Sequence, residues 1–214
     1  MTDRADIARL ASPERLLISG LVAEPDRTIV LLSPDEPAFW DHFRTSAEAG
    51  DGAPHPLDRW SERVIGRIAA TLGAEPLFPF GGPPWHPFPA WAKASGQAWT
   101  APVGLLVHAV SGLFVSYRGA LAVPGAVEDD PAPSSPCPTC AQPCRTACPV
   151  DAFAGGHYDV PRCKAYLDTE AGRTCRQGGC LVRRACPVGR DRRLPAQSAF
   201  HMAAFHPQDA VSRS

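Results

Sequence analysis

Eight cysteines are the residues of this sequence with the most distinctive chemistry. None of the first 136 residues is a cysteine, and the first four cysteines form the run Cys137-Pro-Thr-Cys-Ala-Gln-Pro-Cys-Arg-Thr-Ala-Cys-Pro149. Thiolates bind zinc and iron–sulfur clusters, and in a reducing compartment clustered cysteines favour metal over disulfides. The candidate metal ligands are Cys137, Cys140, Cys144, Cys148, Cys163, Cys175, Cys180 and Cys186.

The spacing C-x2-C-x3-C-x3-C-P of this run is one residue longer than the run of bacterial two-cluster ferredoxins. In such a run the first three thiolates bind one 4Fe–4S cluster, and the fourth turns away to a second cluster. We therefore expect two clusters with crossed ligands. The first would be held by Cys137, Cys140, Cys144 and the distant Cys186. The second would be held by Cys148, Cys163, Cys175 and Cys180.

Two other interpretations of the cysteines stay open at this point, namely two zinc sites or disulfides. Cys175 and Cys180 are spaced like a zinc knuckle, but a run of three plus one cysteines that ends in Cys-Pro is not typical of zinc. The spacings that follow Cys148 match no standard ferredoxin run, so the second cluster could be altered or absent.

Composition indicates a globular protein with a charge asymmetry. The 214 residues are 44% hydrophobic, and no run reaches the roughly 20 apolar residues of a membrane span. The acidic start resembles no signal peptide, so we expect a cytoplasmic protein without a membrane partner. Residues 1–130 carry 10 Lys and Arg against 16 Asp and Glu, whereas residues 131–214 carry 11 against 6. We interpret the basic half as compensation for cluster charge, and nucleic acid is not an expected partner.

Periodicity predicts an α+β domain before the cysteines. Strands are expected at 15–22 and 28–33, with helices at 3–10, 37–44, 56–72 and 90–95. A β-hairpin is expected from strands 103–110 and 113–123, joined at Ser111-Gly112. The acidic, proline-rich stretch 127–136 marks a boundary. These features divide the chain into an α+β domain at 1–130, a cluster module at 131–195 and a docking tail at 196–214.

The proline-rich stretch 76–89 brings several aromatic residues together. Trp85, Phe88 and Trp99 could wall a flat ligand, or could pack over the sheet. His86 and Tyr117 are candidate proton donors, and His108 is expected to be a satisfied core or pocket-edge residue. Arg118 could pair with an anion or with an acid of its own domain.

Two parts of the chain resemble known families. Residues 100–125 resemble the Gly…His-x-x-x-Gly…Arg-Gly hairpin of CblC-type cobalamin-processing proteins, and residues 56–68 resemble their long helix. The run at 137–148, with Arg162-Cys-Lys-Ala-Tyr-Leu-Asp-Thr-Glu170, resembles the cluster module of epoxyqueuosine reductases. Those reductases carry a proton-donating aspartate before the hairpin, but this chain has no Asp between Asp58 and Asp129. We also expect it to lack the tRNA-binding helical-repeat domain of those reductases.

The resemblance implies a CblC-like, flavin-reductase-like sheet domain followed by a small ferredoxin-like 4Fe–4S module. The sheet domain would bind a corrinoid such as cobalamin, or less readily FMN. The implied cofactor-binding residues are Trp85, His86, Phe88, Trp99, Pro102, Gly104, His108 and Arg118.

We therefore expect an electron-transfer protein with two 4Fe–4S clusters, which exchanges electrons with a redox protein and passes them to a bound corrinoid. The alternative is a reductase that acts on its own small substrate, with His86 or Tyr117 as proton donor. A zinc-stabilised interaction module is the third hypothesis.

Overall fold

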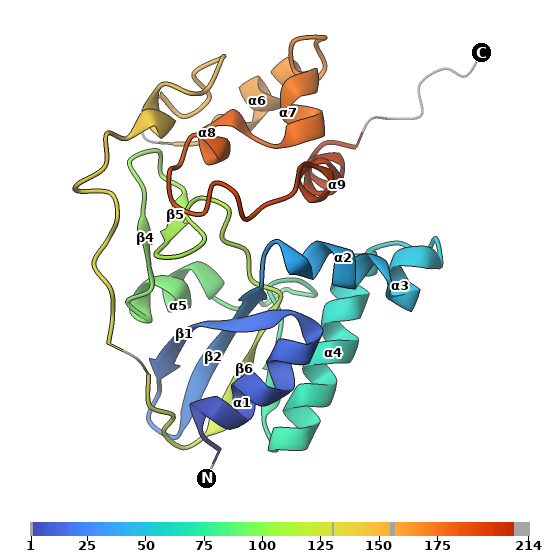
Figure 1. Cartoon of the computed structure of the whole chain (residues 1–214), viewed down its shortest axis with the longest axis vertical. Coiled ribbons are helices and arrows are strands. Elements are labelled where there is room, and N and C mark those ends of the chain that lie inside the picture. Colours follow the sequence, from blue (N-terminus) through green and yellow to red (C-terminus); the bar gives the residue numbers. More distant parts are fainter. Residues whose placement is uncertain (1, 130, 155–156, 208–214) are drawn as a thin grey trace. The chain divides into compact units, whose positions relative to one another are not determined.

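The chain folds into two compact units, each built from two separate stretches of sequence. The computed structural model describes residues 2–129, 131–154 and 157–207 (Figure 1). The sheet unit comprises residues 1–99 and 115–134, and the cysteine unit comprises residues 100–114 and 135–214. This division differs from the sequence-based one at 130/131, because residues 100–114 group with the cysteines. Residues 208–214 of the expected docking tail lie outside the described residues.

An antiparallel four-stranded sheet forms the centre of the sheet unit. Its strand order is β1-β2-β6-β3. The strands are β1 (Leu16–Ala23), β2 (Arg27–Pro34), β3 (Glu75–Leu77) and β6 (Gly119–Pro124). β2 pairs with β1 on one side and β6 on the other, and it is buried along nearly its whole length. Burial on both faces explains why its sequence is a continuous aliphatic run without polar alternation.

Helices cover this sheet, and the longest of them matches the prediction from periodicity. The helices are α1 (Arg4–Ala11), α2 (Ala38–Arg44), α3 (Ala47–Gly50), α4 (Pro56–Leu72) and α5 (Phe88–Ala94), with a 3-10 turn η1 at Ser12–Glu14. Pro56 occupies the first turn of α4, where a missing N–H is tolerated, and Gly73 ends the helix in the left-handed conformation. The buried face of α4 contains Trp60, whose ring meets that of Phe39 edge-on at 5.2 Å.

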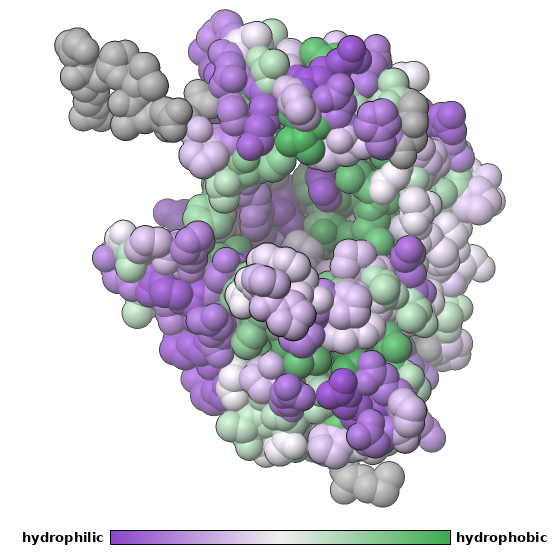
Figure 2. All heavy atoms as spheres, turned by 180° about the vertical axis from the view of Figure 1, so that it is seen from behind, coloured by the Kyte–Doolittle hydropathy of each residue, from purple (hydrophilic) through white to green (hydrophobic). Residues whose placement is uncertain are grey.

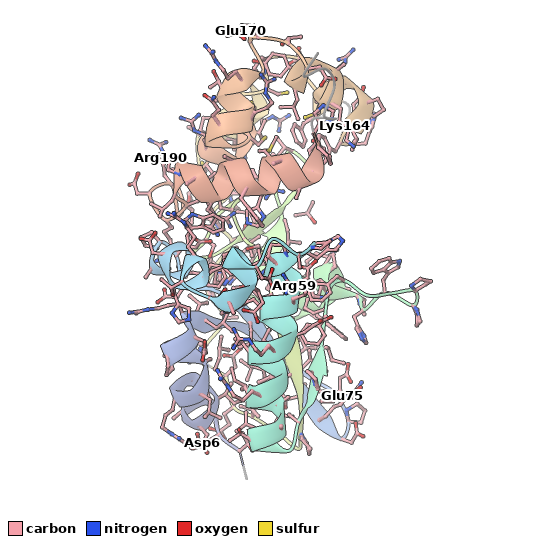
Figure 3. All side chains as sticks on the ribbon, turned by 90° about the vertical axis from the view of Figure 1, so that its right-hand side faces the viewer. Asp6, Arg59, Glu75, Lys164, Glu170 and Arg190 are labelled. Carbon is pink, nitrogen blue, oxygen red and sulfur yellow. The ribbon has the colours of Figure 1, made fainter. Side chains whose placement is uncertain are left out.

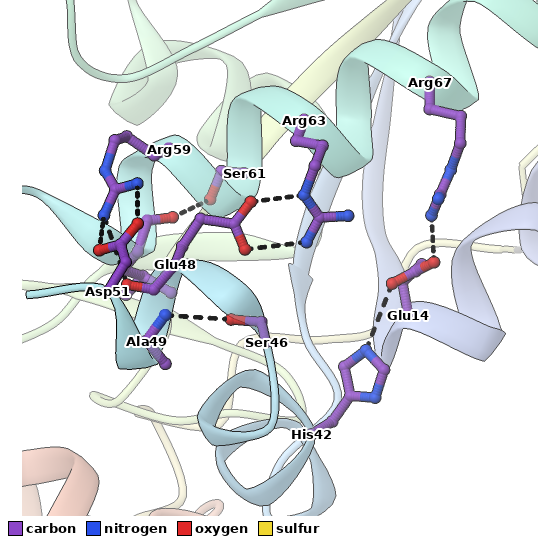
Figure 4. A network of polar contacts seen from close by, with 11 residues as sticks. Glu14, His42, Ser46, Glu48, Ala49, Asp51, Arg59, Ser61, Arg63 and Arg67 are labelled. Atoms are coloured by element: carbon purple, nitrogen blue, oxygen red, sulfur yellow. Dashed lines mark hydrogen bonds and ion pairs between the residues drawn. The ribbon is translucent and has the colours of Figure 1, made fainter. Parts of the chain in front are cut away.

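Ion pairs on the outer face of α4 join this helix to its neighbours (Figure 4). Arg63 binds both carboxylate oxygens of the buried Glu48 in α3, and Arg59 binds Asp51 in the same bidentate manner. Arg67 binds Glu14 of η1. Paired guanidinium and carboxylate groups of this kind fix helix positions more firmly than single surface contacts do.

The predicted β-hairpin at 103–110 and 113–123 is wrong. The first stretch contributes only β5 (Leu106–His108), which pairs with the end of β4 (Ala98–Thr100), and β6 begins only at Gly119. β6 pairs with β2 and β3, so its partners lie in the sheet unit. A tight turn closed by a bridge between His108 and Gly112 is all that remains of the hairpin. The backbone of the aliphatic run 119–123 forms its hydrogen bonds in the four-stranded sheet, where the run is fully buried.

The cysteine unit consists of short helices and turns. They are η2 (Pro143–Arg145), α6 (Val160–Leu167), α7 (Arg173–Gly178), α8 (Leu181–Arg184) and α9 (Pro195–Phe205). α9, which lies in the described part of the tail, packs against α7. Hydrophilic side chains are spread over the visible surface of both units (Figure 2). No helix in the described ranges has the length and apolar character needed to cross a membrane.

Candidate metal centre

The eight cysteines are free thiols that fall into two electrostatically interacting groups. In the first group, Cys137 interacts with Cys140, Cys144 and Cys186, although Cys186 lies 38 residues beyond the run. In the second group, Cys163 and Cys175 interact with each other and with Cys148 and Cys180. These are the two groups that the spacing of the run predicts. We refer to them below as the first and the second cysteine group.

A pocket adjoins the first cysteine group. Its volume is about 340 Å³ including its mouth, and all four thiols of the group line it. The opposite wall is apolar and comes from the segment 100–114. The residues of that wall are Ala101, Pro102, Val107 and Leu113. Four thiols in the lining of one pocket, with apolar side chains that limit solvent access, are features expected of a cluster site.

The tight turn at 108–112 lies against the segment that contains Cys186. His108 is 3% exposed, and its Nδ1 accepts hydrogen bonds from the backbone N–H groups of Val110 (3.1 Å) and Ser111 (3.3 Å). A Cβ atom on Gly112 would lie 2.0 Å from the carbonyl oxygen of Val188 and 3.0 Å from the sulfur of Cys186. The turn therefore contacts the Cys186 segment at a distance that only glycine allows.

Backbone N–H groups point at sulfur atoms in both groups. The Gln142 amide donates to Cys140 Sγ at 3.3 Å, and the Ala152 amide donates to Cys148 Sγ at 3.2 Å. Gln142 and Asp151 both adopt left-handed backbone conformations, with φ of 54° and 52°, which turn these amides inward. Gln142 also lies within the loop that is one residue longer than in ferredoxins, so the longer loop still supplies an N–H donor to sulfur.

Burial disfavours thiolates in both groups when no metal balances their charge. It raises the pKa of the Cys137 and Cys144 thiols above its ordinary value, and the nearby thiols raise it further. Burial likewise raises the pKa of Cys163 and Cys175. A cationic centre reverses this effect, because bound thiols lose their protons to the metal.

Two polar side chains other than the thiols interact with the second cysteine group. The Tyr158 hydroxyl donates to Cys163, and burial followed by this bond raises the pKa of Tyr158. The Tyr158 ring stacks on Phe153 with ring centres 4.6 Å apart. The Arg183 guanidinium interacts with Cys180 and binds the Leu113 carbonyl. Burial lowers the pKa of Arg183, because it disfavours the charged guanidinium, and the neighbouring Cys180 opposes this effect.

Among the described residues, no group of three or more His, Cys, Asp or Glu side chains is arranged so that it could hold a metal ion.

The aromatic residues proposed as a cofactor pocket do not share one environment. The loop before α5 projects from its unit (Figure 3), and Trp85 in this loop is 64% exposed. His86 is exposed and stacks on Trp91 at 5.8 Å, whereas Phe88 is buried and Trp99 is half-buried.

The other candidate residues have mainly structural surroundings. His108 is the satisfied core residue that we expected, and Pro102 lines the pocket of the first group. Gly104 is exposed with φ of 76°. Arg118 lies 3.9 Å from Asp58, an acid of its own unit. The Tyr117 hydroxyl is buried with no hydrogen-bond partner in the part of the chain that the structure describes, and burial raises the pKa of Tyr117, which makes it a weaker acid.

Sequence reasoning missed the contribution of residues 100–114 to the first group, and it missed Tyr158 and Arg183 beside the second. Ser111-Gly112 marked a turn, but its contact with Cys186 spans 74 residues, and no local pattern encodes such a distance. Comparisons with protein-family models, curated proteins and solved structures find no match to this chain.

Proposed function

We propose that this chain is an electron-transfer protein that binds two 4Fe–4S clusters, one in each cysteine group. The observation that carries the proposal is the crossed grouping, in which Cys186 joins three cysteines of the run while Cys148 leaves the run for the second group. Four thiols per group and amides directed at sulfur fit the requirements of this cofactor. Bound clusters would accept and release single electrons.

The protein's own residues have defined roles in this proposal. The thiols anchor the clusters, and the Gln142 and Ala152 amides stabilise negative charge on sulfur. The apolar segment 100–114 limits solvent access to the first group. We further propose that the protein works in the cytoplasm, where free thiols persist. The resemblance of residues 56–68 and 100–125 to CblC-type proteins makes cobalamin the first electron acceptor to test, with FMN as the comparison.

Anaerobic purification with metal analysis tests the cofactor. We expect brown protein with about eight irons per chain, and an EPR signal that appears on reduction. Colourless protein that carries zinc without iron would refute the proposal in favour of the zinc-stabilised module. An unchanged cobalamin spectrum on addition to the reduced protein would remove cobalamin as acceptor but leave the clusters.

Serine substitutions test the crossed ligands. We expect Cys186→Ser to reproduce the EPR changes of Cys137→Ser, because both remove a ligand from the first group. Cys148→Ser should instead match Cys163→Ser, although Cys148 lies only four residues after Cys144. If Cys148→Ser matched Cys137→Ser, the crossed grouping would be wrong.

A further inference from the structure

The cysteine unit carries an excess of basic side chains that its own acids do not balance. Its described residues include ten Lys and Arg against five Asp and Glu, the acids being at positions 151, 159, 168, 170 and 191. Arg162 pairs with Asp159 at 3.7 Å, and Arg173 pairs with Glu170 at 2.9 Å. In Figure 3, Glu170 lies at the outer edge of the unit.

Arg145, Arg184 and Arg190 are exposed and make no ion pair within the described ranges, and the first two lie on neighbouring elements. Arg145 ends η2 and Arg184 ends α8, and these two elements pack against each other. Within the described ranges, neither guanidinium makes an ion pair. Arg145 binds the Gln142 side chain at 3.5 Å, and the Arg184 guanidinium lies over Gly178. We call Arg145 and Arg184 the arginine patch.

The arginine patch borders the first cysteine group. Arg145 follows Cys144 directly, and Arg184 precedes Cys186 by two residues. Cys137 and Cys140 of the same group are half-buried, so the group is not sealed from solvent. A partner that docks on the patch would therefore lie beside the first group.

We infer that the arginine patch is the docking surface for an acidic protein that donates single electrons, and that the first cysteine group is where the electron enters. This inference rests on the proposed function and adds its partner. The donor is oxidised by one electron and the first centre is reduced by one, with no proton or bond exchanged. Redox partners commonly form small, weak interfaces, in which complementary charge speeds association.

An acidic protein fits the patch better than a nucleic acid does. Single-stranded nucleic acids bind where basic residues alternate with exposed aromatic rings. Among the described residues, the exposed large apolar side chains are Trp85 and Val110, and neither belongs to η2 or α8. The two arginines lie on two short elements that pack against each other, and neither element forms an extended basic stripe.

The test compares two double variants of the full-length protein with the same change in net charge. Arg145→Gln with Arg184→Gln removes the patch, whereas Arg162→Gln with Arg173→Gln removes two arginines that already have acidic partners. Iron content is measured first, so that failure of the proposed function is recognised separately. Reduced flavodoxin serves as the acidic donor, methyl viologen radical as a small cationic donor, and calorimetry measures binding of oxidised flavodoxin.

We expect the patch variant to be reduced by flavodoxin about tenfold more slowly than wild type at low salt, and the control variant to stay within about twofold. The difference in rate between the two variants should disappear near 0.5 M salt, because charges then interact over only a few ångströms. Calorimetry should show weaker flavodoxin binding for the patch variant alone, and methyl viologen should reduce all three proteins at the same rate.

Equal slowing in the two variants would overturn the inference, since net charge and not the patch would then matter. Unchanged flavodoxin binding in the patch variant would overturn it as well. A third outcome would also overturn the inference: the wild type binds a single-stranded RNA oligonucleotide more tightly than flavodoxin, and only the patch variant loses this binding. The partner of the arginine patch would then be a nucleic acid and not an acidic protein.

Discussion

Gly112→Ala is the sharpest test of how the distant ligand Cys186 is held. A methyl group at this position would lie 2.0 Å from the Val188 carbonyl oxygen and 3.0 Å from Cys186 Sγ. The residue also has φ of +55°, a conformation that costs a non-glycine residue about 1–2 kcal/mol. Overpacking adds about 1–3 kcal/mol, so we expect a loss of about 2–5 kcal/mol in stability.

This strain acts directly on a ligand of the first group. The turn and the Cys186 segment must separate, because backbone on both sides leaves no flexible side chain to yield. We therefore expect the variant to lose the first cluster and keep the second, with iron falling from about eight to about four per chain. Metal analysis and EPR of the reduced protein measure this loss, and thermal unfolding measures the stability.

Gly125→Ala is the matched control for this variant. Gly125 has φ of +82° but no atom within 4 Å of an added Cβ. Its substitution by alanine should therefore cost only the backbone strain of about 1–2 kcal/mol. If Gly112→Ala kept its full iron content and were no less stable than Gly125→Ala, the turn would not position Cys186.

Two further predictions concern polar contacts. Arg63 lowers the pKa of Glu48 from 4.5 to about 2, so the pair stabilises the fold above pH 4.5 and this contribution fades as pH falls toward 2. Since Arg63 is half-exposed, we expect Glu48→Gln to lower the free energy of unfolding by about 1–2 kcal/mol at pH 7 and by less at pH 3.5, as measured by urea unfolding. Glu62→Gln is the control, because Glu62 is exposed and its substitution should leave the stability nearly unchanged. An equal loss of stability at both pH values would contradict the prediction. Tyr158→Phe removes a hydrogen bond to Cys163 and should lower the reduction potential of the second cluster in an EPR-monitored titration. Tyr166→Phe is its control, because that hydroxyl binds the Ala171 carbonyl at 3.0 Å, and equal potentials in the two variants would show that the bond has no effect.

Local patterns predicted the elements whose sequence determines their own conformation. The helix 56–72 has proline at its start, glycine at its end and one apolar face, and it forms with the expected bounds. The strands at 15–22 and 28–33 were also close to β1 and β2. The hairpin prediction failed because the local sequence of two aliphatic runs joined by Ser111-Gly112 does not show whether the runs pair with each other or with other strands. The pairing of β6 with β2 depends on burial between distant segments.

The cysteine groups were predictable for a different reason. The spacing within the run limits which thiols can meet, and chain geometry sends Cys148 away from its neighbours. Tyr158 and Arg183 could not be identified in this way, since one tyrosine or arginine has no distinctive spacing. Their proximity to sulfur follows only from how α8 and the stretch after Ala152 fold.

The segment 100–114 has a consequence for how the protein can be divided and assembled. The chain passes between the two units three times, after residues 99, 114 and 134, so no single cut separates them. A fragment that begins at residue 131 would contain all eight thiols but lack one wall of the first pocket. During synthesis, that wall is translated before any cysteine. Cys186 is translated last of the four thiols in the first cysteine group, so this group is complete only once the chain has reached residue 186.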